Sequence, residues 1–455
     1  MTVQAALDYA MSRRSHFVDQ LGELVAIPSI STDITRRDEL RQAADWLVAK
    51  LNSMGLKNAQ LFPPDSHPFV YAEELSAGAK SPTVLIYGHY DVQPAEPLDK
   101  WSSDPFRPTV RGDNLYGRGA SDMKGNVLAT VFAVEALHSH GGLPVNVKFL
   151  IEGQEEIGSP TIGRFIAEHR DLLASDFCLN TDTGMLAPDM PTITYALRGL
   201  AYFELRVFGP AKDLHSGVFG GAVHNPAQAL CELIAGMHDQ NGTVTLPGFY
   251  DRVRQLDSAE RAELARLPVT DALVMERSGV PKLWGESQYP VVERLGARPT
   301  LEINGIYSGF IGEGTKTVLP AYAMAKISTR LVPDQDADQI KSQLEAYCRL
   351  KAPPTVRWEV IDLVHSPPAL SDRNSRWVKA MSRAQETVWG VPPLFKREGG
   401  SVPVVADLKT HLGIECVNVG CGLPDDNLHG PNEKLHLPAF YKLIDALIHF
   451  LGGLG

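Results

Sequence analysis

The sequence predicts an α/β protein in which a mostly parallel sheet, covered by helices on both faces, is interrupted by an inserted α+β domain. Short apolar segments bounded by Gly and Pro alternate with helical segments up to about residue 190, and this pattern resumes after residue 367. At 455 residues, the chain also exceeds the length over which a single hydrophobic core keeps growing. We therefore expect one domain from residues 1–190 and 367–455 and a second from residues 191–366.

The first part of the chain is predicted to alternate between helices and buried strands. Helices are expected at residues 17–25 and 39–54, followed by a strand at 83–88. A helix at 126–138 and a strand at 145–153 come next. Both strands are continuous apolar runs between Gly and Pro, which is typical of strands buried on both faces. This alternation indicates a parallel sheet with helices on both sides.

The middle of the chain has a different pattern. Residues 193–209 are predicted to form two strands separated by a turn, and a helix follows at 226–237. A strand at 322–331 is likewise followed by a helix, at 336–350. Strands and helices in this order predict one helical layer on an antiparallel sheet. Residues 240–300 are rich in charge and short helical pieces, and the sequence assigns them no clear element.

The last part of the chain returns to the first pattern. A helix is expected at residues 375–388, a short apolar strand at 415–420 and a final helix at 438–451. These elements belong with the parallel sheet because the strand is again a short apolar run of the buried kind.

Composition and charge exclude several classes of partner. The chain has 43 Lys and Arg against 54 Asp and Glu, and a net charge of -11 argues against nucleic acid or an anionic membrane. The N-terminal segment has the pattern of an amphipathic helix rather than a leader, and no stretch approaches the roughly 18 apolar residues of a membrane span. The five cysteines are scattered without a CxxC pair, as in a reducing compartment. We expect a cytoplasmic protein.

Polar side chains suited to metal binding follow three of the buried strands. His89 and Asp91 follow the first strand, Glu155 and Glu156 follow the second, and Asp182 follows a short apolar segment further along. In open α/β sheets, ligands bind at the carboxyl ends of the strands, so these side chains are expected at one edge. Their shared placement is stronger evidence than any one motif, because each alone is equally consistent with a polar strand end, an acidic loop or a turn.

Two further residues complete the set. Asp122 lies between Gly119 and Gly125 just before a helix, where a carboxylate can bridge two metal ions or simply cap the helix. His429 lies in a Gly/Pro loop between the last strand and the last helix, where an exposed loop histidine is the alternative. Because His429 is needed to complete a set drawn from the first 190 residues, the domain that holds the site must be discontinuous.

The residue types indicate hydrolytic chemistry at a pair of metal ions. The i, i+2 spacing lets His89 bind a metal through one ring nitrogen while Asp91 holds the proton on the other. Of the adjacent carboxylates, one can bind metal and the other can act as a general base whose pKa is raised by its neighbour. Nitrogen and oxygen ligands without thiolate suit zinc first, then manganese or cobalt. Two bridged ions can ionise a water and polarise a carbonyl at once, so we expect a hydrolase.

In order, type and spacing, the motifs resemble those of the M20 family of di-metal peptidases and deacylases, most closely its cytosolic nonspecific dipeptidase and carnosinase-like branch. The motifs are GHYDVQP (88–94), GRGASDMKG (117–125), EGQEEIGS (152–159), NTDTG (180–184) and DDNLHGPNE (425–433).

The resemblance implies two divalent ions in each subunit. One ion would be held by His89, Asp122 and Asp182, and the other by Asp122, Glu156 and His429. Glu155 would be the general base and Asp91 would orient His89. The peptide bond from Asp122 to Met123 is then expected to be cis.

The resemblance also implies that the inserted domain is a lid that dimerises. In DLHSG (213–217), His215 would reach the active site of the partner subunit and hydrogen-bond the oxyanion there. Thr317, Arg330 and Ser401, in GEGTKTVLP, STRLVP and REGGSVP, would contact the substrate, with Arg330 gripping a free C-terminal carboxylate.

The expected function is hydrolysis of the peptide bond of dipeptides or short peptides. An N-acyl amino acid deacylase, which would use the same metals on an acylated substrate, is the first alternative. A binding or scaffold protein without activity is a remote one, because Glu155 and every ligand position are present. The sequence predicts neither the preferred side chains of the substrate nor the native metal.

Overall fold

The computed structural model describes residues 3–63, 67–400 and 402–455 and divides into two compact units. Unit 1 comprises Met1–Tyr195, Ser371–Lys396 and Val402–Gly455, and unit 2 comprises Ala196–Leu370 and Arg397–Ser401. Unit 1 is therefore built from separated stretches of the chain. Within the described residues, every helix is too short or too polar to cross a membrane.

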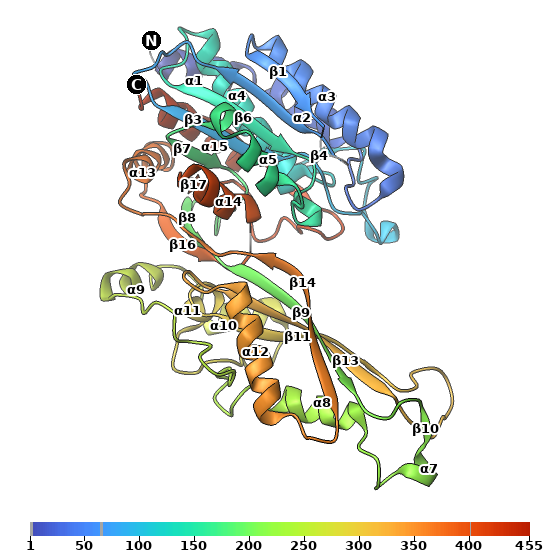
Figure 1. Cartoon of the computed structure of the whole chain (residues 1–455). Helices are drawn as coiled ribbons and strands as arrows, with labels where there is room; N and C mark the ends of the chain where they lie inside the picture. The colour runs from blue at the N-terminus through green and yellow to red at the C-terminus, as the bar shows by residue number, and fades with distance from the viewer. Residues whose placement is uncertain (1–2, 64–66, 401) are drawn as a thin grey trace. The chain divides into compact units, whose positions relative to one another are not determined.

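A nine-stranded sheet lies mainly in unit 1, and Figure 1 labels most of its strands. Its order is β1-β2-β6-β3-β7-β17-β8-β15, with β16 beside β8. The four strands β6, β3, β7 and β17 are parallel, whereas β1, β2 and β8 run antiparallel to their neighbours. The strands are β1 (Lys57–Phe62), β2 (Phe69–Glu74), β3 (Thr83–His89), β6 (Asn146–Glu152), β7 (Phe177–Asn180), β8 (Thr192–Leu197), β15 (Ala369–Leu370), β16 (Leu394–Glu398) and β17 (Cys416–Asn418).

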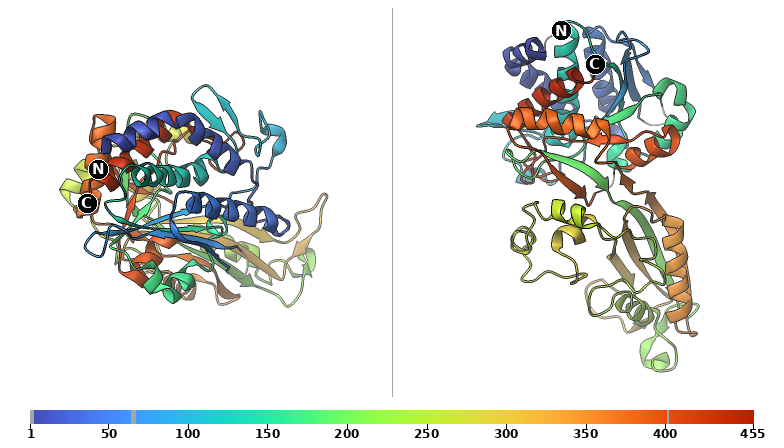
Figure 2. Two further views of the ribbon diagram at one scale, coloured as in Figure 1. Left: turned by 90° about the horizontal axis from the view of Figure 1, so that it is seen from above. Right: turned by 90° about the vertical axis from the view of Figure 1, so that its left-hand side faces the viewer.

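Helices cover both faces of this sheet, so the predicted fold class is confirmed. Figure 2 shows α1, α4 and α15 on one face and α5 and α14 on the other. The helices of unit 1 are α1 (Val3–Ser12), α2 (Arg14–Val25), α3 (Arg37–Ser53), α4 (Gly125–Ser139), α5 (Ile162–Glu168), α6 (Arg170–Leu173), α13 (Arg376–Trp389), α14 (Pro403–Leu412) and α15 (Leu437–Gly452). Helix α4 is mostly apolar and is buried around its whole circumference, since its first thirteen residues are all buried.

The core of unit 1 joins the beginning of the chain to its end. The ring of Phe17 in α2 stacks on Phe132 in α4 at 4.0 Å. Phe177 in β7 contacts two aromatic side chains from the last 80 residues, stacking on Trp377 at 4.2 Å and meeting Phe450 edge-on at 5.8 Å. A separate three-stranded sheet also joins distant parts of the chain. In it, β18 (Lys434–His436) pairs with β5 (Asn114–Tyr116), which pairs with β4 (Thr109–Arg111).

Unit 2 is built on a four-stranded antiparallel sheet with the order β11-β13-β9-β14. Helices α8 and α12 pack on it, as the predicted strand and helix pairs required. Its elements are β9 (Gly199–Phe208), β10 (Leu214–His215), α7 (Ser216–Phe219), α8 (Pro226–Ala235), α9 (Ser258–Leu264), α10 (Asp271–Ser278), α11 (Val291–Gly296), β11 (Thr300–Ser308), β12 (Val318–Leu319), β13 (Tyr322–Leu331), α12 (Ala337–Lys351) and β14 (Arg357–Ser366).

The strand pair expected at residues 193–209 divides between two sheets. Strand β8 lies beside β17 in the sheet of unit 1, whereas β9 lies between β13 and β14 in unit 2. A single residue, Arg198, separates them. Alternation of apolar side chains identifies a strand but not its neighbour, so the sequence pattern alone did not distinguish this crossing from a local turn.

The segment without a sequence assignment, residues 240–300, is organised around a buried ion pair. The guanidinium of Arg298 donates two hydrogen bonds of 2.7 Å to the carboxylate of Glu286. The same guanidinium lies over the rings of Tyr289 and Tyr250, at 4.1 and 5.0 Å from their centroids. This ion pair is an internal contact, whereas charged residues of the same segment such as Arg254 and Arg261 are exposed.

A buried ion pair between two helices of unit 1 gives a stability prediction. Lys50 in α3 contacts Glu135 in α4 at 2.5 Å, with little exposure of either side chain. Glu135→Gln is expected to lower the free energy of unfolding by about 1–3 kcal/mol, because a buried hydrogen bond between charged groups is replaced by a weaker one. Glu39→Gln in α3 is the control, since its pair with Arg36 is partly exposed and worth about 0.5 kcal/mol. Urea denaturation measures both, and equal losses would contradict this ranking.

Candidate metal centre

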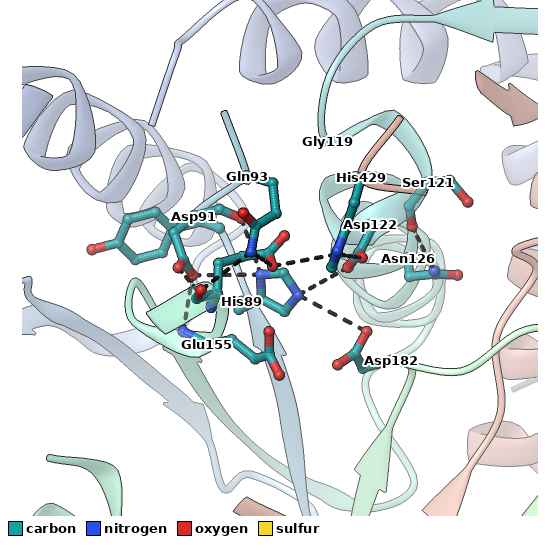
Figure 3. Close-up of polar contacts among 12 residues, drawn as sticks. His89, Asp91, Gln93, Gly119, Ser121, Asp122, Asn126, Glu155, Asp182 and His429 are labelled. Atoms are coloured by element: carbon teal, nitrogen blue, oxygen red, sulfur yellow. Dashed lines mark hydrogen bonds and ion pairs between the residues drawn. The ribbon is translucent and has the colours of Figure 1, made fainter. Parts of the chain in front are cut away.

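Three parallel strands of unit 1 deliver five of the predicted side chains to one edge of the sheet. His89 is the last residue of β3, and Asp91 follows two positions later. Glu155 and Glu156 form a short 3-10 helix just beyond β6, and Asp182 lies two residues beyond β7. Because β3, β6 and β7 run parallel, their carboxyl ends meet, and Figure 3 shows His89, Asp91, Glu155 and Asp182 gathered there.

Loops bring the remaining two side chains to the same place. Asp122 belongs to a single π-helical turn, Ala120–Lys124, that precedes α4, and its peptide bond to Met123 is cis as predicted. His429 lies in the loop between β17 and β18, with a left-handed backbone of φ 58°. Both side chains point toward the strand ends in Figure 3.

The carboxylate of Asp122 lies between two histidines. Its Oδ1 is 3.2 Å from Nε2 of His89, and its Oδ2 is 3.1 Å from Nε2 of His429. Asp182 Oδ1 lies 3.9 Å from the same nitrogen of His89, and Glu156 Oε2 lies 3.4 Å from the same nitrogen of His429. Two groups of three potential ligands result, and Asp122 belongs to both.

Both groups fit a divalent ion. Tetrahedral zinc with bonds of about 2.0–2.2 Å separates neighbouring ligand atoms by roughly 3.4 Å. The measured separations range from 3.1 to 3.9 Å, and all ligand atoms of a group lie within 4.8 Å of one another. Imidazole nitrogen and carboxylate oxygen are also the donors that zinc, manganese and cobalt accept.

Asp91 is placed differently from the prediction in one respect. Nδ1 of His89 lies 3.0 Å from the backbone oxygen of Asp91 and 3.4 Å from its carboxylate, so the carbonyl is the nearer partner. The carboxylate instead accepts the backbone N–H groups of Glu155 and Glu156, at 3.2 and 3.0 Å. Asp91 is fully buried and connects the end of β3 to the turn that carries both glutamates.

Burial and crowding raise the pKa of most acidic groups at this edge. Burial, assisted by the charge of Asp122, raises the pKa of Glu156 to about 7. Burial also raises the pKa of Asp182 to about 6, although His89 opposes the shift. For Glu155, burial and the neighbouring carboxylates together hold the pKa well above its usual range. These carboxylates therefore favour a bound cation or a proton in place of bulk water.

The pKa values of Asp122 and His89 shift in the directions that favour their charged forms. Burial opposes ionisation of Asp122, but hydrogen bonds to His429 and His89 hold its pKa below the usual range. Burial likewise opposes charge on His89, yet its contacts with Asp122 and Asp91 raise its pKa overall. Asp122 thus retains its negative charge, as a bridging ligand must.

Two predicted substrate residues lie side by side in unit 2. His215 in β10 pairs with Val318 in β12, and the N–H of Ser216 donates to the backbone oxygen of Thr317 at 3.0 Å. Both His215 and Thr317 are exposed. Nδ1 of His215 accepts the N–H of Gly217 at 3.0 Å, so the neutral ring carries its proton on Nε2.

Arg330 lies in β13 of unit 2 and has a second arginine near it. Burial and the charge of Arg330 together lower the pKa of Arg198 to about 10. Arg198 donates to the backbone oxygens of Gly399 and Arg298, both at 3.3 Å. The sequence analysis treated Arg198 only as part of a turn. Ser401 lies outside the described residues.

Three residues of unit 1 support the ligands and were missed by the sequence analysis. Gln93 donates to the carboxylate of Glu156 at 2.8 Å, and Glu433 accepts the backbone N–H of Asp122 at 3.0 Å. Arg118 donates to the backbone oxygen of Gly430, the residue after His429, at 3.1 Å. All three lie within the motifs quoted above, but their side-chain partners are distant in sequence.

Proteins that are similar in sequence to this chain over nearly its whole length are metal-dependent or other dipeptidases. A Cys-Gly metallodipeptidase of Schizosaccharomyces pombe is 32% identical over 467 residues, covering 97% of this chain and 96% of the relative. The human Beta-Ala-His dipeptidase is 33% identical over 451 residues, covering 95% of this chain and 89% of the relative. The resemblance to the dipeptidase and carnosinase-like branch is confirmed.

A solved structure extends the similarity to three dimensions. The M20 family metallo-carboxypeptidase Sso-CP2 from Sulfolobus solfataricus superposes with a TM-score of 0.85 at 32% identity, covering 96% of this chain and 98% of that chain. Residues 85–452 match the family described as Peptidase family M20/M25/M40, and this range contains every side chain of the two ligand groups. The chain belongs to peptidase family M20/M25/M40.

Proposed function

We propose that this protein is a dipeptidase that uses two divalent ions to hydrolyse the peptide bond of small peptides with a free C-terminal carboxylate. The observation that carries the proposal is the carboxylate of Asp122, which presents one oxygen to His89 and the other to His429. A hydrolase that activates water between two ions needs such a bridging ligand. The dipeptidase activities named for its relatives support the same substrate class.

In this proposal, one ion is held by His89, Asp122 and Asp182, and the other by Asp122, Glu156 and His429. When bound, the two ions would supply a water of lowered pKa and polarise the scissile carbonyl. Zinc is the proposed metal, with manganese and cobalt as alternatives that the same donors accept.

Glu155 is proposed as the general base. Its carboxylate lies in the turn beside the ligands but outside both ligand groups, so it remains available for proton transfer. Its raised pKa suits a group that takes a proton from the attacking water near neutral pH and then gives it to the leaving amine. Asp91 positions this turn by accepting the N–H groups of Glu155 and Glu156.

Arg330 is proposed to bind the C-terminal carboxylate of the substrate through its planar guanidinium. The nearby charge of Arg198 adds to the positive potential at this place, which favours an anionic group. Thr317 and Ser401 are proposed to donate hydroxyl hydrogen bonds to the same substrate.

His215 is proposed to act on the substrate bound by a partner subunit, with unit 2 as the lid and dimerisation domain. The proton on Nε2 makes its exposed ring a donor for an oxyanion. Large apolar side chains are exposed in the segments next to β10 and β12 along the chain, among them Val218 at 70% and Ile311 at 79%. Such exposure is typical of a surface that a partner covers.

Two other expectations concern the substrate and the location of the protein. The deacylase alternative is not favoured, because the relatives compared above are dipeptidases. A cytoplasmic location stays a prediction.

Replacing the proposed base separates its role from that of a ligand. Glu155→Gln is expected to lower kcat on a dipeptide such as Cys-Gly or β-Ala-His by about 10²–10⁴-fold, because the amide cannot take the proton. The protein should keep its two ions, as measured by elemental analysis. Glu156→Gln is the matched control and should lose metal as well as activity. Normal turnover in the metal-loaded Glu155→Gln protein would refute the role of the base.

Mixed dimers test whether His215 acts in trans. Glu155→Gln and His215→Ala should each be nearly inactive alone, the latter by about 10²–10³-fold. When the two are co-expressed, a mixed dimer has one site with both residues intact, and random pairing should restore roughly a quarter of wild-type activity.

The control for this experiment co-expresses Glu155→Gln with Asp182→Asn. Both changes affect groups of unit 1, so each site of the mixed dimer remains defective and no activity should return. Absence of recovery in the Glu155→Gln and His215→Ala mixture, with mixed dimers present by native mass spectrometry, would exclude action in trans.

A further inference from the structure

We propose that the buried ion pair Arg118–Glu433 is a positioning clamp that holds Asp122 and His429 at the separation needed for the second ion. The inference rests on the proposed metal-dependent function and concerns residues to which that function gives no role. Both side chains are almost completely buried, with exposures of 1% and 0%, and their closest atoms are 2.6 Å apart.

The carboxylate of Glu433 grips the backbone of the loop that carries Asp122. Its Oε1 accepts the N–H groups of Ser121 and Asp122, at 3.1 and 3.0 Å. Its Oε2 accepts the N–H of Gly119 at 2.9 Å and the guanidinium of Arg118 at 2.6 Å. Four donors converge on one side chain, so a single carboxylate binds four of the five residues from Arg118 to Asp122.

Arg118 connects the ion pair to the loop of His429. Its Nη2 donates to the backbone oxygen of Gly430 at 3.1 Å and to that of Pro94 at 3.1 Å. Gly430 follows His429 directly in the chain. The ion pair therefore contacts the backbone at Asp122 on one side and beside His429 on the other.

A second buried contact joins the same two loops. Ser121 Oγ donates to Asp426 Oδ2 at 2.7 Å, and Lys434 donates to the other oxygen of Asp426 at 3.0 Å. Asp426 also accepts the N–H of Leu423 at 2.8 Å, which ties the beginning of the His429 loop to the same carboxylate.

The loop of His429 needs such support more than the strand ends do. Asn427, His429 and Asn432 all have a left-handed backbone, which non-glycine residues keep only when the surrounding structure holds them there. The His429 side chain is 55% exposed, so packing contributes little to its position. His89, in contrast, ends a central strand and is fully buried. Loss of the clamp should therefore affect the Asp122, Glu156 and His429 group more than the other group.

Glu433→Gln changes the hydrogen-bonding groups in this network but keeps the size of the side chain. An amide offers one acceptor oxygen, and its NH₂ group would face backbone N–H groups or the guanidinium of Arg118. Residues that support metal ligands typically contribute 10–100-fold to metal affinity. We expect Glu433→Gln to weaken binding of the ion in the Asp122, Glu156 and His429 group by about 10–100-fold and binding of the other ion by much less.

The experiment titrates full-length protein with Zn²⁺ in competition with a chromophoric chelator and repeats the titration with Co²⁺, whose absorption reports ligand geometry. Glu135→Gln is the matched control, because it makes the same change in another largely buried ion pair of unit 1, away from the ligands. Arg118→Lys is the second variant, since it keeps the positive charge but removes the guanidinium fork that reaches Gly430. Thermal denaturation of each metal-free protein measures the general loss of stability.

Selective weakening of one ion in Glu433→Gln, with two ions of normal affinity in Glu135→Gln, would support the clamp. Unchanged binding in Glu433→Gln, equal weakening of both ions, or the same change in Glu135→Gln would overturn it while leaving the proposed function intact. If Glu433→Gln does not fold, the same titration results in Arg118→Lys support or overturn the clamp. Wild-type protein that binds fewer than two ions would overturn the proposed function and the clamp together.

Discussion

Crowding of negative charge at one buried edge is the constraint on which the rest of unit 1 depends. The charge of Asp122 lies close enough to Glu155, Glu156 and Asp182 to raise their pKa values, and burial removes the water that would otherwise screen these charges. Such groups stay together only when a rigid scaffold holds them and positive charge compensates them. The parallel strands supply the rigid scaffold. His89 and His429, which contact Asp122, supply part of the compensating positive charge.

The strands and the gathering of polar side chains at their ends were predictable because local sequence encodes both. A short apolar run between Gly and Pro identifies a buried strand, and the polar residue that follows it must lie at the sheet edge. For this reason His89 and Asp182 could be placed together from their positions alone. Strand β13, Tyr322–Leu331, has the predicted bounds, and buried side chains alternate with more exposed ones along most of it.

Features that depend on distant partners were not predictable. Glu433 reads as one more charge in a Gly/Pro loop, and nothing near it in the chain reveals that its carboxylate meets the backbone of Asp122, 311 residues away. Arg298 also looks like a surface charge until the structure reveals Glu286 and two tyrosine rings around it. The nearest partner of His89 Nδ1, the carbonyl of Asp91 rather than its carboxylate, depends on a difference of 0.4 Å, from 3.4 to 3.0 Å. Sequence patterns do not resolve such a difference.

The division of unit 1 along the chain has a consequence for biosynthesis. His429 follows Asp122 by 307 residues, and at about 5–20 residues per second a ribosome needs roughly 15–60 s to make that stretch. During this interval the nascent sheet lacks β17, which lies between β7 and β8, and all of unit 2 emerges first. A ribosome-bound or prematurely terminated chain therefore has an incomplete ligand set. The proposed second ion can be bound only after the loop of His429 has been synthesised and has reached Asp122.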